Sequence, residues 1–351
     1  MIVPSYLKFT VVLLSICLVV LVLYLAQNIF IPLLLSLLFA ILLRPLVFFF
    51  HIKLRLNNTL YCLISVFLFV LFFSGIIFLV SWKISEITND WTAIKHNLNS
   101  HYANIQLWIL QHYKVNYSAQ ETYFFQFTGK AFGGNNQWMG NTISSFTNGL
   151  FMMVLIPVYT FLILLYRSLF IEFLHKIVNA QQQDNLVDIL SKIKTVIQRY
   201  ILGLLIELSV VATLTTVGLM LIGVEYALLL GLITALFNLI PYIGIISAAV
   251  ISILATLGNS TDLSLVFGVL LVNVIVQLID NNVLVPKIVG NQVRINALAS
   301  IVGVIVGGSI AGLPGMFLSI PLIAILKVVF DHVNVLKPWA HLIGNSMSDI
   351  H

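Results

Sequence analysis

The sequence predicts an all-α polytopic membrane protein with about eight membrane segments and an inverted repeat of span plus broken-helix hairpin in its C-terminal half. Of its 351 residues, 60% are apolar and 8% are charged, whereas a soluble domain carries about 25% charged residues. Several apolar runs exceed the ~20 residues that cross a bilayer. Two later runs are too long for one span and are interrupted by proline and glycine. A soluble chain could not bury so much apolar surface.

Residues 1–82 are predicted to form three spans. The first apolar run is longer than the core of a signal peptide and has no convincing cleavage site, so we interpret it as a retained span. Arg44, Lys53 and Arg55 follow the second span and place that loop, and hence the N-terminus, in the cytoplasm. The predicted spans are 6–27, 29–50 and 59–82.

The region 83–146 is the long polar part of the chain, and we expect it outside the cytoplasm. Its apolar residues recur at steps of three and four, which predicts a helix: Trp91, Ile94, Leu98, Tyr102, Ile105 and Ile109. The region 147–199 follows, with a fourth span near 148–166 and a basic amphipathic helix on the cytoplasmic side. The remaining parts are a transport core, 200–336, and a cytoplasmic tail, 337–351.

The core contains four apolar segments, and two of them are too long. Residues 227–257 and 297–330 count 31 and 34 residues and are interrupted near Pro241 and Pro314. Proline breaks a helix and glycine permits a reversal, so each segment is predicted to be a hairpin of two half-length helices. This places Lys287 in the cytoplasm and gives the two halves of the core opposite orientations. Long kinked helices remain the alternative.

Four blocks of this core resemble the autoinducer-2 exporter (AI-2E) family of bacterial membrane proteins. The blocks are RYILGLLIE, GVEYALLLGLITALFNLIPYIG, DNNVLVPKIVG and GLPGMFLSIPLIAILKVVF. The resemblance implies a multi-pass permease-like protein of the bacterial inner membrane that forms a homo-oligomer. The family is named for export of a quorum-sensing furanone, and some members are linked to sodium–proton exchange. Where the family often has glutamine after Arg-Tyr, the nearby polar residue here is Glu207.

Glu207 is the first candidate for the chemistry, because it lies about two turns into a predicted span. An ionised carboxylate is costly at that depth, so Glu207 is a functional candidate by default. An acid that is costly to ionise readily holds a proton, and this suits a proton carrier. The alternative is a carboxylate near the interface that is hydrated or paired with Arg199.

A second group of polar residues surrounds the end of the segment 264–280. Asn273, Gln277 and Asp280 share one helical face, and Asn281 and Asn282 follow them. Their oxygens suit a hard cation and could equally bind a polyhydroxylated solute. The alternative is a plain hydrophilic helix end, in which Lys287 pairs with Asp280.

The two predicted hairpin tips complete the candidate substrate-binding or ion-binding site. Tips of this kind expose backbone amides and carbonyls to a cavity, although a packing kink without a ligand is the alternative. The residues are Asn238, Pro241, Tyr242 and Gly244 at the first tip, and Gly312, Pro314 and Gly315 at the second.

Taken together, these features predict a secondary transporter that exports a small solute or an ion, coupled to protons or sodium. The alternatives are a sodium–proton antiporter and a non-transporting oligomeric channel or scaffold. Hydrolase, Walker and zinc-protease motifs do not occur in the sequence, so we expect no enzyme, no cofactor and no metal site. The expected partners are the lipid bilayer, a small solute or monovalent cation and further copies of the chain, but not nucleic acid. Both termini are expected in the cytoplasm.

Overall fold

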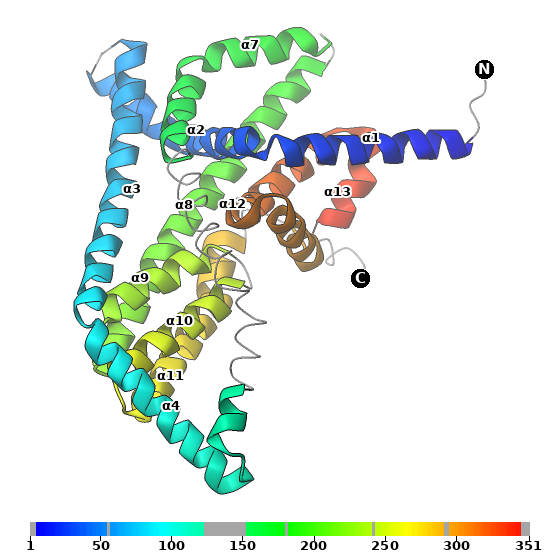
Figure 1. Cartoon of the computed structure of the whole chain (residues 1–351). Coiled ribbons are helices and arrows are strands. Elements are labelled where there is room, and N and C mark those ends of the chain that lie inside the picture. Colours follow the sequence, from blue (N-terminus) through cyan, green and yellow to red (C-terminus); the bar gives the residue numbers. More distant parts are fainter. Residues whose placement is uncertain are drawn as a thin grey trace. The chain divides into compact units, whose positions relative to one another are not determined.

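The computed structural model describes residues 5–54, 57–122, 152–179, 182–240, 243–290 and 295–344. The described residues form helices joined by short connections (Figure 1). The N-terminal helices are α1 (Ser5–Leu25), α2 (Gln27–Leu54), α3 (Asn58–Asn89), α4 (Trp91–Tyr113), an unlabelled helix over Met152–Leu165 and α7 (Arg167–Ile177). The later ones are α8 (Gln183–Leu221), α9 (Ala227–Asn238), α10 (Ile243–Asn259), α11 (Leu263–Ile279), η2 (Asp280–Gly290), α12 (Ala297–His332), η3 (Asn334–Leu336) and α13 (Lys337–Ile343).

Within the described residues, five helices are long and apolar enough to cross a membrane. A sixth span results if Met152–Leu165 and α7, which meet at a bend of 64°, are counted together. Large apolar side chains on these helices are exposed, including Phe67 (63%), Phe78 (70%) and Phe267 (71%). Apolar surface of this extent requires a lipid environment. The prediction of an all-α polytopic membrane protein is therefore confirmed.

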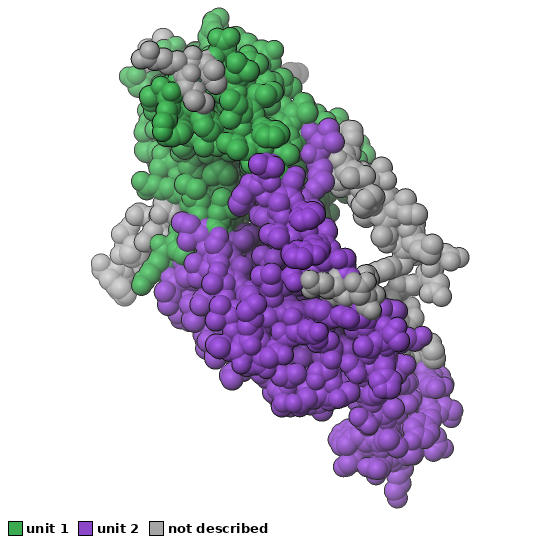
Figure 2. All heavy atoms as spheres, turned by 90° about the vertical axis from the view of Figure 1, so that its left-hand side faces the viewer, with its two compact units in different colours: residues 1–70, 155–205, 286–351 green, residues 71–154, 206–285 purple. Residues whose placement is uncertain are grey.

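The chain divides into two compact units (Figure 2). Unit 1 comprises residues 1–70, 155–205 and 286–351, and unit 2 comprises residues 71–154 and 206–285. Helix α8 contributes to both units. Its first half carries the predicted amphipathic pattern, and the helix continues without a break into the apolar segment that follows Arg199.

In unit 1, α2 packs against the helix Met152–Leu165 through buried hydroxyl groups. The Ser36 hydroxyl lies 2.9 Å from the Ile156 carbonyl oxygen, and Thr160 also bonds its own helix at that carbonyl. Ala40, Leu43 and Leu164 belong to the apolar cluster beside this contact. Serine and threonine are small, and their hydroxyls bond carbonyl groups of the helix backbone. They therefore allow two helices to pack closely in an apolar environment.

Helix α12 is a hairpin rather than one straight rod. Its backbone leaves the helical region at Ala311 and at Gly312, which has φ 59° and ψ −143°. The Ser319 hydroxyl lies 2.8 Å from the carbonyl oxygen of Gly303, sixteen residues earlier. In a straight helix those residues would be about 24 Å apart. The chain therefore reverses near Pro314, and the two arms of α12 lie side by side.

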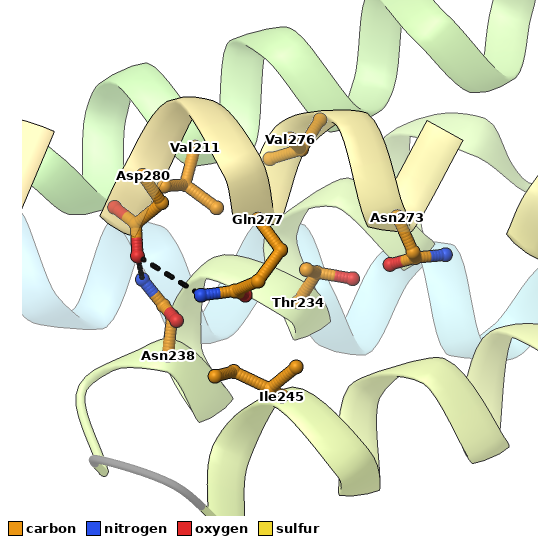
Figure 3. A pocket seen from close by; sticks show the side chains of 8 residues that line it. All are labelled: Val211, Thr234, Asn238, Ile245, Asn273, Val276, Gln277 and Asp280. Carbon is orange, nitrogen blue, oxygen red and sulfur yellow. Dashed lines mark hydrogen bonds between the residues drawn. The ribbon is translucent and has the colours of Figure 1, made fainter. Parts of the chain in front are cut away.

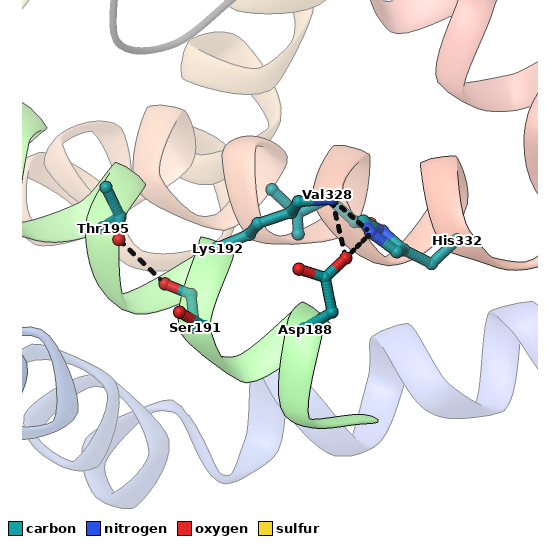
Figure 4. Close-up of polar contacts among 6 residues, drawn as sticks. All are labelled: Asp188, Ser191, Lys192, Thr195, Val328 and His332. Atoms are coloured by element: carbon teal, nitrogen blue, oxygen red, sulfur yellow. Dashed lines mark hydrogen bonds and ion pairs between the residues drawn. The ribbon is translucent and has the colours of Figure 1, made fainter. Parts of the chain in front are cut away.

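A polar cluster joins the first turns of α8 to the end of α12 in unit 1 (Figure 4). Asp188 Oδ2 lies 2.7 Å from Lys192 Nζ and 3.1 Å from His332 Nε2. The His332 Nδ1 atom lies 2.6 Å from the Val328 carbonyl oxygen, which can only accept, so Nδ1 carries hydrogen. These exposed contacts contribute modestly to stability and fix the start of α8 against α12.

Unit 2 is built around a second hairpin, formed by α9 and α10. The two helices run antiparallel, because Leu230 near the start of α9 shares a small pocket with Thr256 near the end of α10. At the other end, a Cβ atom on Gly244 would overlap the Phe237 carbonyl, so the start of α10 approaches the end of α9 closely. Glycine is required there because any side chain would separate the two helices.

Helices α8 and α11 flank this hairpin in unit 2. A Cβ atom on Gly231 of α9 would overlap the Thr216 hydroxyl of α8, and one on Gly218 of α8 would come within 2.7 Å of Val272 of α11. Asp262 caps α11 by accepting from the Ser264 amide at 2.8 Å. The hydroxyl and amide of Ser264 hold the pKa of Asp262 below its usual value.

Helix α4 lies across the end of unit 2 where α9 begins and α10 ends (Figure 1). Asn97 Nδ2 donates to the Gly258 carbonyl at 3.1 Å, and His101 Nε2 lies 2.8 Å from the Ser260 carbonyl oxygen. The Tyr226 hydroxyl donates to Asp90 at 2.8 Å, just before α4 begins. This polar region thus packs on the open end of the α9–α10 hairpin, away from its tip.

Candidate functional site

Two carboxyl groups and one amide meet at the tip of the α9–α10 hairpin, inside unit 2. Glu207 comes from α8 and is 6% exposed, whereas Asp280 follows α11 and is 3% exposed. The side chain of Asn238, the last residue of α9, lies between them. Its Nδ2 atom donates to Glu207 Oε1 at 3.0 Å and to Asp280 Oδ2 at 3.1 Å. Since this nitrogen carries two hydrogens, both of them are used, one for each acid.

The local structure explains why Asn238 can reach both acids. Helix α9 ends at Asn238, and the close approach at Gly244 turns the chain back into α10. The tip residue is thus held between α8 and α11. Helix α11 is continued from Asp280 onward by η2, a wider helix of the i→i+5 type. Helical turns of this type are rare in proteins, and those that occur often lie at functional sites.

The predicted polar face of α11 lines a small pocket that also contains Asp280 and Asn238 (Figure 3). Gln277 Nε2 lies 3.5 Å from Asp280 Oδ2 and 3.0 Å from Asn281 Oδ1. Asn273 donates to the Val269 carbonyl at 2.9 Å and leaves its oxygen toward the pocket side of the helix. The complete lining is Val211, Thr234, Asn238, Ile245, Asn273, Val276, Gln277 and Asp280.

The pocket has a volume of about 20 Å³, which is room for one water molecule or one small ion. Within the described part of the chain, two buried oxygen atoms of its lining have no hydrogen-bond partner, Asp280 Oδ1 and Thr234 Oγ1. Buried polar atoms are normally satisfied, so an orphaned acceptor indicates a water or ion site. Carboxylate, amide and hydroxyl oxygens are ligands for hard cations and for protons.

Repulsion between the two carboxylates of Glu207 and Asp280 favours the binding of a proton or a cation at this site. Two ionised carboxylates that share one amide repel each other in a poorly solvated site. One bound proton or monovalent cation removes this repulsion. Groups of three or more His, Cys, Asp or Glu residues that could hold a metal ion do not occur in the described ranges.

The other predicted site residues have different surroundings. Asn281 and Asn282 are exposed, and Asn282 donates to the Leu278 carbonyl one turn back. Gly244 is a packing position at the hairpin tip. Pro241 and Tyr242 lie outside the described residues. Gly312, Pro314 and Gly315 belong to the reversal of α12 in unit 1.

Thr234 is a lining residue that the sequence reasoning missed. It precedes Asn238 by four residues and therefore shares its helical face. That spacing was the available signal, but a threonine in an apolar helix usually bonds its own backbone and attracts no attention.

The spans, the hairpins and the buried acid pair define a polytopic membrane protein with a polar site inside its helix bundle. The family model described as "AI-2E family transporter" matches residues 13–334, so the chain belongs to the AI-2E family. This confirms the resemblance seen in the sequence.

Individual relatives are consistent with this family. The chain is 26% identical over 283 residues to "Putative transport protein YueF" of Bacillus subtilis, covering 77% of this chain and 76% of that protein. It is 27% identical over 245 residues to a "Putative transport protein" of Borreliella burgdorferi, covering 68% and 64%. A shorter match, 30% identical over 136 residues and 38% of each chain, is to "Putative permease PerM" of Escherichia coli. These relatives support a role in membrane transport.

Proposed function

We propose that this protein is a secondary transporter of the bacterial inner membrane, in which Glu207 and Asp280 bind the coupling ion, a proton or sodium. The observation that carries the proposal is the shared hydrogen bonding of both acids to Asn238. Binding of one proton or sodium ion between the acids cancels one of their two negative charges and changes which oxygen atoms accept hydrogen bonds from the Asn238 amide. Such a change at the tip of a hairpin provides the link between ion binding and movement of the hairpin.

The size of the pocket bears on what is transported. About 20 Å³ accommodates a water molecule or an ion and excludes an organic solute from the pocket in this conformation. Sodium–proton antiport is therefore a second candidate function, because it requires no larger cavity. In the first candidate, export of a furanone-like or related small solute, the solute binds elsewhere along the route and the acid pair supplies the coupling.

Purified protein in liposomes loaded at acidic pH tests the acid pair. If the chain exchanges sodium for protons, addition of external sodium drives proton efflux from wild-type vesicles, reported by a pH-sensitive dye. Glu207→Gln and Asp280→Asn are each expected to lower this flux about tenfold or more, because a neutral amide cannot exchange a proton. Export of a labelled furanone under an imposed proton or sodium gradient, measured in parallel, distinguishes solute transport from antiport.

The matched control is Glu172→Gln on α7, an exposed acid whose partner is Lys176 four residues later. It is expected to transport like the wild type. Wild-type-like flux with unchanged pH and sodium dependence in both Glu207→Gln and Asp280→Asn would contradict the proposed site. A wild type that moves neither ion nor solute would favour the channel or scaffold alternative.

We further propose a topology in which the α9–α10 hairpin enters and leaves the membrane on the extracytoplasmic side. Helix α9 has 12 residues, which rise about 18 Å and reach only part of the way through a hydrocarbon core of about 30 Å. Its tip and the acid pair then lie at membrane depth. Helix α12 forms the oppositely oriented hairpin of an inverted repeat, and both termini are cytoplasmic.

Cysteine labelling tests this topology in whole cells. Asn259→Cys, at the end of α10, is expected to react with a membrane-impermeant maleimide from outside. Asn291→Cys is expected to react only after the cells are opened, because the basic residues nearby hold that loop in the cytoplasm. The reverse pattern would contradict the proposed topology of the α9–α10 hairpin. Crosslinking of the same cells reports whether copies of the chain associate, as a homo-oligomer requires.

A further inference from the structure

Three buried hydroxyl groups of unit 2 have unusual surroundings. Thr215 and Ser252 are 0% exposed and Thr234 is 9% exposed, yet in the described portion of the chain their hydroxyl oxygens have no hydrogen-bond partner. Helical serines and threonines commonly bond the carbonyl one turn back. Nearby residues do so: Thr213 bonds Ser209 and Thr256 bonds Ser252, each at 2.8 Å. The three hydroxyls therefore lack both the usual bond to their own helix and any other hydrogen-bond partner in the described residues.

The geometry of the hairpin brings two of them to the same level. Leu230 and Thr256 line one small pocket, which sets the register of the antiparallel helices α9 and α10. One helical turn closer to the tip on each helix are Thr234 and Ser252. They therefore face the same level of the hairpin, and Thr234 also lines the pocket that contains Asp280.

Thr215 joins this level from α8. Its neighbour Thr216 packs directly against Gly231 of α9, so Thr215 lies at the height of Gly231 and Thr234. Val211, one turn before Thr215 on the same helix, lines the Asp280 pocket. Three hydroxyls from three helices thus follow the pocket in the direction away from the hairpin tip.

A second small pocket, about 10 Å³ in volume, continues in that direction. It is lined by Thr256, one turn beyond Ser252, and by Glu225 and Asn259 at the α4 end of unit 2. Asn259 Nδ2 donates to Glu225 Oε2 at 2.5 Å, and both residues lie near the surface. Polar groups therefore recur at each turn from Asp280 to this end.

We propose that the inner face of the α9–α10 hairpin holds a chain of water molecules that connects the carboxyl pair with the α4 end of unit 2. The inference rests on the proposed function for its role, the passage of protons to and from Glu207 and Asp280. Each buried hydroxyl binds one water as donor or acceptor, which satisfies the orphaned atoms. A proton moves when each oxygen accepts one hydrogen and releases another, so no net charge remains on the hydroxyls.

Thiol accessibility tests for water without relying on transport. In a Cys17→Ser, Cys62→Ala background, Thr234→Cys and Ser252→Cys are compared with Val269→Cys, a 0% exposed position in the neighbouring apolar cluster. Membrane vesicles are treated with silver ion, and the remaining thiols are labelled with a fluorescent maleimide after denaturation. We expect silver to protect positions 234 and 252 at least about tenfold faster than position 269. Equal protection of all three, or of none, would overturn the water chain.

Transport by hydroxyl-free variants tests what the water does. The double variant Thr215→Val, Ser252→Ala keeps nearly the same volume and is expected to slow proton flux about tenfold, with sodium affinity unchanged, because neither residue lines the Asp280 pocket. Thr213→Val, whose hydroxyl bonds its own helix, is the control and should transport normally. Wild-type flux in the double variant would overturn the role in proton passage while the acid pair stands. Protected thiols together with normal flux in Glu207→Gln and Asp280→Asn would instead contradict the proposed function and leave the water chain supported.

Discussion

Asn238→Leu is expected to destabilise the protein and to abolish the ion flux proposed for Glu207 and Asp280. Leucine has a similar size but no hydrogen to donate, so Glu207 Oε1 loses its partner and Asp280 Oδ2 loses the nearer of its two donors. Removing a donor from a buried acid costs far more than a typical hydrogen bond contributes. We expect the free energy of unfolding to fall by about 3 kcal/mol at neutral pH.

The pH dependence of this loss identifies its cause. Asn238 stabilises the ionised form of the acids, so its removal matters most when they are ionised and least when they are protonated. Thermal unfolding in detergent should show a difference between wild type and variant that grows as the pH rises. Asn185→Leu, at an exposed position of α8, is the control for the added apolar side chain. A pH-independent difference would mean that Asn238 acts through packing alone.

Gly307→Ala and Gly315→Ala are expected to prevent the two arms of α12 from packing against each other. A Cβ atom on Gly307 would overlap the Ser319 hydroxyl and the Gly315 carbonyl, and one on Gly315 would overlap the Gly307 carbonyl. Backbone cannot move aside as a flexible side chain can, so the two arms must separate. We expect each variant to lower the free energy of unfolding by about 3 kcal/mol and to reduce the yield of folded protein in membranes.

Gly75→Ala is the matched control for this pair. Gly75 lies within α3, and a Cβ atom there would meet nothing within 4 Å. Alanine should be neutral or should stabilise α3 by about 0.5–1 kcal/mol. Unfolding in detergent, followed by intrinsic fluorescence, compares the three variants with wild type. Equal stability of all four proteins would mean that the arms of α12 do not pack as described.

The membrane class and most helix positions could be predicted from composition and from the length of apolar runs. The reversal of α12 could also be anticipated, because 34 apolar residues exceed what one span needs and Pro314 interrupts them. The predicted boundaries of α11 differ from the observed ones by one residue at each end. Longer helices were harder to predict, since α8 continues from its amphipathic half into the apolar half without a signal at the junction.

The candidate site was only partly predictable, for two physical reasons. The shared face of Asn273, Gln277 and Asp280 follows from helical periodicity and holds up to the end of α11. Beyond Asp280 the chain forms wider turns, so the 3.6-residue period no longer tells which side chains lie together. The contact between Glu207 and Asn238 joins residues from different helices, and no local pattern encodes which helices pack. Ser252 is recognised in the structure by its missing hydrogen bond.

The closed arms of α12 have a mechanical consequence. Their contact consists of glycine backbone, apolar side chains and the Ser319 hydroxyl, which bonds the carbonyls of Gly303 and Gly315 at 2.8 and 2.7 Å. None of these groups gains or loses charge between acidic and alkaline solution. The packed arms of α12 should therefore stay rigid when the pH changes, and a conformational change driven by protonation is expected in other parts of the chain.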